Sequence, residues 1–127
     1  MSYPYDVAKD TAGHTPELCS RFHRASELIG RRWSSAILLA VTRGAHRFSE
    51  IQASVPGLSD RMLAQRLREL SAAELITRDV VPSTPVQVIY LLTPRGHELM
   101  AALQPLVHWG MRWHRLDEHA EAERDAG

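Results

Sequence analysis

FSEIQASVPGLSDRMLAQRLRELSAAE, residues 48–74, is the stretch that decides the fold expected for this chain. Its first part predicts a helix over residues 48–55, because three apolar residues recur along one stripe at helical spacing: Phe48, Ile51 and Val55. Pro56-Gly57 then ends that helix, since proline cannot continue the hydrogen-bond ladder and glycine accepts the left-handed geometry of a helix exit. The remainder predicts a second helix, joined to the first by a tight turn.

The start of this second helix is well specified. Ser59 can cap its free N–H groups, Asp60 adds negative charge at its positive end, and Leu58 can pack against a residue one turn further on. Three leucines then fall on one face and are expected to point into the core: Leu63, Leu67 and Leu70.

The opposite face of the second helix carries residue types that read the major groove of DNA. They are Arg61, Ala64, Gln65 and Arg68. Arginine can form two hydrogen bonds with guanine, glutamine can do so with adenine, and alanine can meet a thymine methyl group. This row predicts a DNA-reading helix-turn-helix; the alternative at this point is an ordinary solvated helix face.

Charge is segregated along the chain, although the formal net charge is +0. Bases outnumber acids between Arg21 and Arg78, whereas the end after Leu116 is mostly acidic. Nearly every base in the middle is an arginine, which suits bidentate contacts with phosphate and guanine. A basic body with an acidic end therefore favours a nucleic-acid partner.

Length and composition indicate the class of protein. A chain of 127 residues, 44% of them apolar and 24% charged, suits one globular domain. We expect a cytoplasmic protein, because no apolar run approaches the roughly 18 residues of a membrane helix and the start lacks a signal pattern. One cysteine excludes an internal disulfide framework. We expect no enzyme activity, cofactor or metal site, because no catalytic set has a convincing spacing and His108, His114 and His119 do not share a helical face.

The segments before residue 48 complete one side of the expected fold. Residues 1–14 have little apolar periodicity and are expected to form a mobile arm. Thr15-Pro16 starts a helix that runs to about residue 29. Its candidate buried residues are Leu18, Phe22, Ala25 and either Leu28 or Ile29. A strongly apolar helix follows over residues 33–42, and it should be buried almost all round through Trp33, Ile37, Leu38 and Val41.

A β-hairpin is predicted after the two central helices, because residues 75–81 and 87–92 are rich in valine, isoleucine and threonine. The proline-containing loop between them is longer than a two-residue turn, so the hairpin should project as a wing. Thr93-Pro94 starts a last helix, which Pro105 should kink or divide in two. Its apolar stripe consists of Leu99, Leu103, Leu106, Gly110 and Trp113.

Apolar stripes at both ends of so small a chain predict a homodimer, since helices paired across a two-fold axis can bury them. The candidate interface residues are Leu18, Phe22, Leu103, Leu106, Trp109 and Trp113. The alternative is that the C-terminal stripe covers its own hairpin and first helix. The expected fold class is mainly α with a small β-hairpin wing: a winged helix-turn-helix domain over residues 15–116, dimerising through its N- and C-terminal helices, with an acidic tail over residues 117–127.

The order of several motifs resembles the HxlR-type winged helix-turn-helix transcriptional regulators, over about residues 19–113. The motifs that carry the resemblance include Glu27-Leu28-Ile29-Gly30, Arg47-Phe48-Ser49-Glu50, Pro56-Gly57-Leu58-Ser59 and Gln65-Arg66-Leu67-Arg68-Glu69-Leu70. The resemblance implies a cytoplasmic bacterial regulator that binds an inverted-repeat operator in double-stranded DNA as a homodimer. The expected DNA-binding residues are Arg47, Ser49, Ser59, Asp60, Arg61, Gln65, Arg66, Arg68 and Gln87.

The resemblance also makes Cys19 the candidate redox sensor, because it matches a cysteine that senses oxidants or electrophiles in several members of that family. The chain departs from the family pattern in two places. Cys19 lies one residue further from Trp33, and Ser20 replaces a proline. Gln87 stands where the second wing strand usually has an arginine, which weakens the expected contact between wing and phosphate.

Several alternatives stay open from the residues alone. Arg66 can pair with an acid or a helix end instead of a phosphate, and Cys19 can be a small buried apolar group. The chain can also respond to a small aromatic molecule held between dimer helices near Trp109 and Trp113. A further alternative is a winged-helix module that binds protein.

Overall fold

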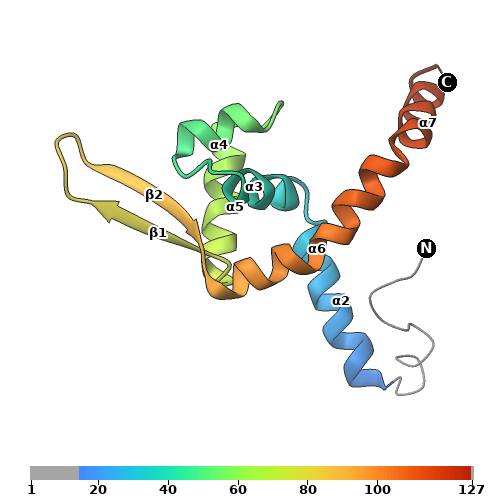
Figure 1. The fold of residues 1–127 in the computed structure, drawn as a ribbon, viewed down its shortest axis with the longest axis horizontal. Helices are drawn as coiled ribbons and strands as arrows, with labels where there is room; N and C mark the ends of the chain where they lie inside the picture. The colour runs from blue at the N-terminus through green and yellow to red at the C-terminus, as the bar shows by residue number, and fades with distance from the viewer. Residues whose placement is uncertain (1–14, 127) are drawn as a thin grey trace.

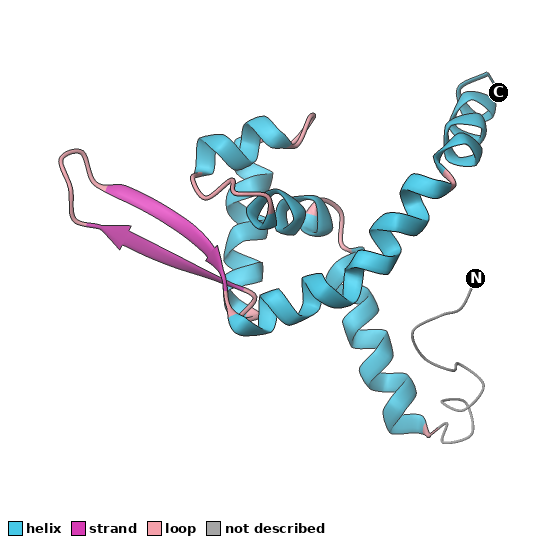
Figure 2. Cartoon of the chain, viewed as in Figure 1, coloured by secondary structure: helices cyan, strands magenta, loops and turns pink. Residues whose placement is uncertain are grey.

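The structure is a computed structural model and describes residues 15–126, so the mobile arm expected over residues 1–14 lies outside the described residues. Figures 1 and 2 show a compact helical centre from which a β-hairpin and several longer helices extend. The elements are α2 (Pro16–Gly30), α3 (Ser34–Thr42), α4 (Phe48–Ser54), α5 (Asp60–Ala72), β1 (Ile76–Val81), β2 (Gln87–Leu92), α6 (Pro94–Arg112) and α7 (His114–Ala126).

The predicted helix starts are confirmed by three side-chain caps. The Oγ1 of Thr15 accepts a hydrogen bond from Leu18 N at 3.1 Å, at the start of α2. The Oγ of Ser59 accepts one from Met62 N at 3.1 Å and caps α5. Thr93 does the same for α6. Each cap satisfies an N–H group that the first turn of a helix leaves without a backbone partner.

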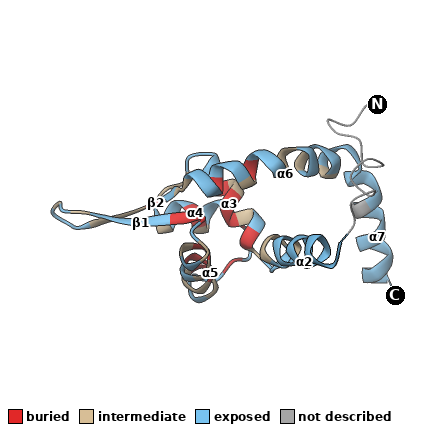
Figure 3. Ribbon diagram, turned by 90° about the horizontal axis from the view of Figure 1, so that it is seen from below, coloured by how far each residue is buried: buried red, intermediate tan, exposed pale blue. Residues whose placement is uncertain are grey.

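The core forms where α3 lies against the helix-turn-helix (Figure 3). The predicted inward leucines Leu63, Leu67 and Leu70 are all buried, as are Ile51 and Val55 on the predicted stripe of α4. The turn between these helices contains Gly57 at a φ of +85°, the left-handed conformation expected at that helix exit.

The hairpin is antiparallel and its register runs from Ile76 opposite Leu92 to Val81 opposite Gln87. Its far end projects away from the helices (Figure 1), so the predicted wing is confirmed. The base of the wing is tied to the helix-turn-helix, because Tyr90 N donates a 2.7 Å hydrogen bond to the carbonyl oxygen of His46, just before α4. The wing therefore has a defined position beside α4.

The prediction that the N-terminal helix is buried is wrong within one chain. Leu18, Phe22 and Ala25 are exposed, with Phe22 at 72%, and only Leu28 and Ile29 near the end of α2 are half-buried. The physical reason is that α2 contacts α3 but extends away from the body, so its first turns have no neighbour in the same chain (Figure 1).

The C-terminal stripe divides at about its middle. Leu99 and Leu103 pack on the core, and Met100 is buried, because the first half of α6 lies against α3 and β2. In the second half, Leu106, Trp109 and Trp113 are exposed. The stripe thus covers its own chain only in part.

Two features of the C-terminal region go beyond or correct the expectation. Helix α6 continues through Pro105 as a single element, so the division considered for that position did not occur. The acidic end, for which no element was predicted, forms α7.

Candidate nucleic-acid interface

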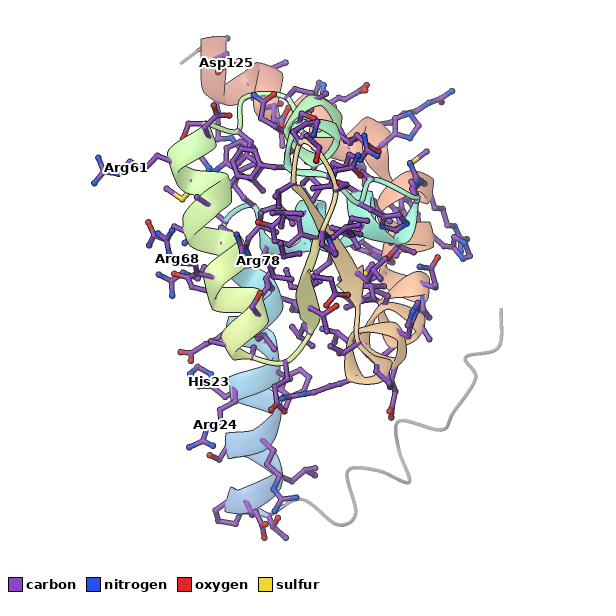
Figure 4. The ribbon with its side chains drawn as sticks, turned by 90° about the vertical axis from the view of Figure 1, so that its left-hand side faces the viewer. His23, Arg24, Arg61, Arg68, Arg78 and Asp125 are labelled. Carbon is purple, nitrogen blue, oxygen red and sulfur yellow. The ribbon has the colours of Figure 1, made fainter. Side chains whose placement is uncertain are left out.

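The outward face of α5 keeps the composition that the sequence predicted. Arg61 and Arg68 are exposed, whereas Ala64 and Gln65 between them are half-buried. Figure 4 shows Arg61 and Arg68 extending from the same side of this helix, away from the body. A helix that presents two arginines and a glutamine to solvent on one face has the donors needed to read base edges and bind phosphate.

The two helix starts of the helix-turn-helix lie exposed. Ser59 caps α5, and Asp60 follows in its first turn, where its negative charge interacts favourably with the positive end of the helix dipole. Ser49 is exposed in the first turn of α4. The N–H groups at such helix ends are suited to an anion, so a phosphate can approach beside either serine.

Arg47 and Gln87 are brought together from opposite ends of the motif. The Nη2 of Arg47 donates a 3.0 Å hydrogen bond to Oε1 of Gln87, the first residue of β2, and its Nε lies 3.7 Å from Oε1 of Glu50. The guanidinium of Arg47 and the amide of Gln87 therefore lie together where α4 adjoins the wing. Gln87 thus links the wing to the helix-turn-helix and orients Arg47.

Arg66 requires a correction among the expected DNA-binding residues. Its exposure is only 7%, its Nε donates a 2.8 Å hydrogen bond to the carbonyl oxygen of Arg32, and its Nη1 pairs with Oε2 of Glu69 at 3.1 Å. The ion-pair alternative is therefore confirmed. The reason is helical phase, because Arg66 lies next to Leu67 and Leu70 on the face that packs inward.

Arg78 is a candidate that the sequence placed in the basic region without assigning it a site. It is exposed on β1, and with Arg68 it lines a cavity of about 370 Å³ between α5 and the wing. The other residues around this cavity are Phe48, Ala64, Leu67, Ser71 and Tyr90. Two arginines from different elements thus line one cavity, and both are labelled in Figure 4. The sequence could not show this cavity, because it depends on how the hairpin docks against α5.

Cys19 is exposed in the first turns of α2, so within one chain it is not the buried apolar group of the alternative interpretation. Two nearby basic side chains contact acids on the same helix. Arg21 pairs with Glu17, and Nε2 of His23 lies 3.0 Å from Oε1 of Glu27.

The described residues contain no group of three or more His, Cys, Asp or Glu side chains that could hold a metal ion. Over the same part of the chain, no helix is both long enough and apolar enough to cross a membrane.

A capped helix-turn-helix, an arginine-bearing face on its second helix and an adjoining hairpin define the class of winged helix-turn-helix proteins. The model of the HxlR-like helix-turn-helix family matches residues 28–118. The chain belongs to this family of transcriptional regulators.

Two relatives come from Bacillus subtilis (strain 168). The HTH-type transcriptional regulator YvaP is 40% identical over 97 residues, which cover 76% of this chain and 90% of that protein. The HTH-type transcriptional regulator YodB is 41% identical over 92 residues, covering 72% of this chain and 82% of that protein.

Solved structures of two regulators resemble the fold. The reduced form of YodB from B. subtilis matches with a TM-score of 0.64 at 40% identity, covering 76% of this chain and 91% of that one. The reduced form of the redox regulator HypR matches with a TM-score of 0.71 at 28% identity, covering 78% of this chain and 98% of that one.

Proposed function

We propose that this HxlR-family regulator acts in the cytoplasm and binds an inverted-repeat operator as a homodimer, and that oxidants or electrophiles change its affinity through Cys19. The observation that carries the DNA-binding part is the outward row on α5 beside the wing, with its two exposed arginines. Its reading residues are Arg61 and Gln65. The residues that position the protein on phosphates are Arg47, Ser49, Ser59, Arg68 and Arg78, with Asp60 and Gln87 supporting the helix start and Arg47.

Base reading and phosphate anchoring should separate on mutation. Arg61→Ala is expected to relax the base preference and to cost about 1–3 kcal/mol on the best operator, because it removes hydrogen bonds to a base edge. Arg47→Ala should lower the affinity for all sequences alike. Binding-site selection followed by titration of each variant measures both effects. An unchanged preferred sequence in Arg61→Ala would show that this face of α5 does not read bases.

The homodimer is supported by the apolar side chains that one chain leaves exposed. Phe22 and Leu18 on α2, and Leu106, Trp109 and Trp113 on α6 or just after it, lie on the helices that extend from the body. Exposed apolar surface of this extent marks an interaction site in a protein that is otherwise well packed. A second copy can cover it, and a two-fold dimer that reads two half-sites requires its two α5 helices to lie about 34 Å apart, one turn of B-DNA, or a multiple of that distance.

Phe22→Glu is the corresponding test of the dimer. Because burying a phenylalanine contributes about 1.5–3 kcal/mol, the variant should raise the dimer dissociation constant at least about tenfold. Sedimentation velocity measures this constant. Val80→Glu, at an exposed apolar residue of the wing, is the matched control and should leave the dimer intact. A wild-type protein that sediments as a monomer at micromolar concentration would contradict the proposal.

The redox part rests on the exposure of Cys19 and on the solved relatives. YodB has been solved in reduced, diamide-treated and quinone-bound forms, and HypR in reduced and oxidized forms. In this chain, two Cys19 thiols from the two subunits can form a disulfide if their Cα atoms approach within about 7 Å, with diamide taking up the two hydrogens. The bond would change the relative placement of the subunits and so of the two α5 helices.

Diamide should therefore change the operator affinity of the wild type, by about 5–150-fold if the coupling is of ordinary size. Cys19→Ser should not respond, since it keeps the size of the side chain but not the thiol. Titrating labelled operator before and after diamide treatment measures both proteins. Equal affinities in all four samples would leave Cys19 without a sensing role.

A further inference from the structure

The joint between α2 and α3, Arg31-Arg32-Trp33, is fastened to the helix-turn-helix at separate points. The buried Arg66 of α5 donates to the carbonyl oxygen of Arg32 at 2.8 Å. The Nη2 of Arg31 pairs with Oε1 of Glu69, also on α5, at 3.2 Å. The end of the N-terminal helix is thereby attached to the helix proposed to read DNA.

Trp33 adds a contact to the turn of the motif and has an uncommon backbone. Its φ is +78°, in the left-handed region that a bulky residue adopts only where surrounding contacts hold it. A Cβ placed on Gly57 would lie 3.5 Å from Cη2 of Trp33, so the indole ring lies against the turn between α4 and α5. The guanidinium of Arg32 covers the same ring at 4.7 Å from its centroid.

The carboxylate of Glu69 is the point where this joint meets the reading face. Its Oε1 accepts from Nε2 of Gln65 at 3.3 Å, one turn earlier on α5. The same carboxylate pairs with Arg66 at 3.1 Å and with Arg31 at 3.2 Å. Gln65, one of the residues proposed to read bases, is thus hydrogen-bonded to the carboxylate of Glu69, which also pairs with Arg31 in the α2–α3 joint.

We propose that Glu69 is a positioning residue for base recognition: it holds the amide of Gln65 in its reading orientation and connects that orientation to the α2–α3 joint through Arg31. The inference rests on the proposed function, since it requires Gln65 to read a base. A glutamine amide that already has one N–H bonded to Glu69 loses rotational freedom and presents its remaining donor and acceptor in a fixed direction. A displacement of α2 changes the Arg31–Glu69 pair and thereby the orientation of Gln65.

The test compares discrimination at one base pair, defined as the position where Gln65→Ala loses its preference in binding-site selection. Discrimination is the ratio of affinities for the best operator and for the operator changed at that pair. Glu69→Ala should reduce it about 5–10-fold, a part of the value of a good base contact. The double variant Gln65→Ala/Glu69→Ala should lose no more than Gln65→Ala alone, because Glu69 acts through Gln65. Arg31→Ala should give a smaller loss, about twofold, at the same pair.

Two further variants keep the result interpretable. Glu98→Ala removes the same charge from an exposed position on α6 and should leave discrimination unchanged. Glu69→Gln keeps an acceptor for Gln65 but lacks the charge that holds both arginines; it should lose about 2–5-fold, and it replaces Glu69→Ala if loss of the Arg66 partner prevents folding. Circular dichroism measures the fold of each variant.

The outcomes that overturn the inference are distinct from those that overturn the proposed function. Unchanged discrimination in the folded Glu69 variants, an equal loss at every base pair, or a loss additive with that of Gln65→Ala would each reject a positioning role. A wild-type protein that selects no sequence would instead reject the proposed function.

Discussion

Raising the salt concentration from about 50 to 200 mM is expected to weaken operator binding by about a thousandfold to a hundred-thousandfold. This range applies to a dimer that makes about six to ten phosphate contacts, because each contact releases condensed counterions from the DNA. The cations proposed for this role in each subunit are Arg47, Arg68 and Arg78, all exposed. Fluorescence anisotropy with labelled operator over a salt series measures this effect as the slope of the logarithm of the binding constant against the logarithm of the salt concentration.

The chain has a formal net charge of +0, so a steep slope would have to come from local arrangement and not from overall charge. Arg78→Ala should lower the slope by about one for each phosphate that no longer meets a cation, thus by about two for a dimer. Arg124→Ala removes an equal charge from the acidic helix α7 and should leave the slope unchanged. Equal affinity at low and high salt would argue against DNA as the partner and favour a winged-helix module that binds protein.

The parts of the fold that sequence predicted well depend on local chemistry. The hydroxyls of Ser59 and Thr93 each accept a hydrogen bond from the backbone N–H three residues further along the chain, and Gly57 adopts the positive φ of a helix exit. Each sequence signal and its structural effect therefore lie within one turn. The leucine face of α5 was predictable for the same reason, because helical periodicity alone places Leu63 and Leu67 on one side.

The features that the sequence did not predict depend on which elements meet. Helical phase left the role of Arg66 open, because which groups its side chain meets depends on how the Arg32 carbonyl and Glu69 lie around it. The Arg47–Gln87 hydrogen bond joins residues 40 apart, so it follows from the docking of the wing. The exposure of Phe22 likewise depends on the direction in which α2 leaves the body of the same chain.

Departures from local preference mark the places where tertiary structure dominates. Trp33 is a bulky residue with a φ of +78°, and nothing in its local sequence requires that conformation. Its backbone is held by neighbours distant in sequence, through the Arg66 hydrogen bond and the packing of the ring on the turn at Gly57. A strained residue such as Trp33 therefore indicates that distant elements pack against it, and the periodicity of the sequence does not show such contacts.

Gly96→Ala is expected to destabilise the protein by about 3 kcal/mol or more, although alanine is normally the better helix residue. Gly96 lies buried in the first turn of α6, where its N–H donates to Oγ1 of Thr93 at 2.9 Å. A Cβ at this position would overlap the backbone carbonyl oxygen of Leu75 and lie 3.3 Å from Cδ2 of Leu92. Backbone is the obstacle, so no side-chain rotation relieves the overlap.

The clash would also separate two other bonds at the same corner, since Oγ1 of Thr93 donates to the carbonyl oxygen of Glu74 at 2.6 Å and Thr93 N donates to that of Leu75 at 3.0 Å. Chemical denaturation followed by circular dichroism measures the loss. Gly30→Ala is the matched control, because a Cβ there meets nothing within 4 Å, and it should leave stability equal or raise it by about 0.5–1 kcal/mol. If Gly96→Ala proved as stable as Gly30→Ala, α6 would have to begin further from the α5–β1 turn than the structure places it, and the base of the wing would be less rigidly attached to the reading helix.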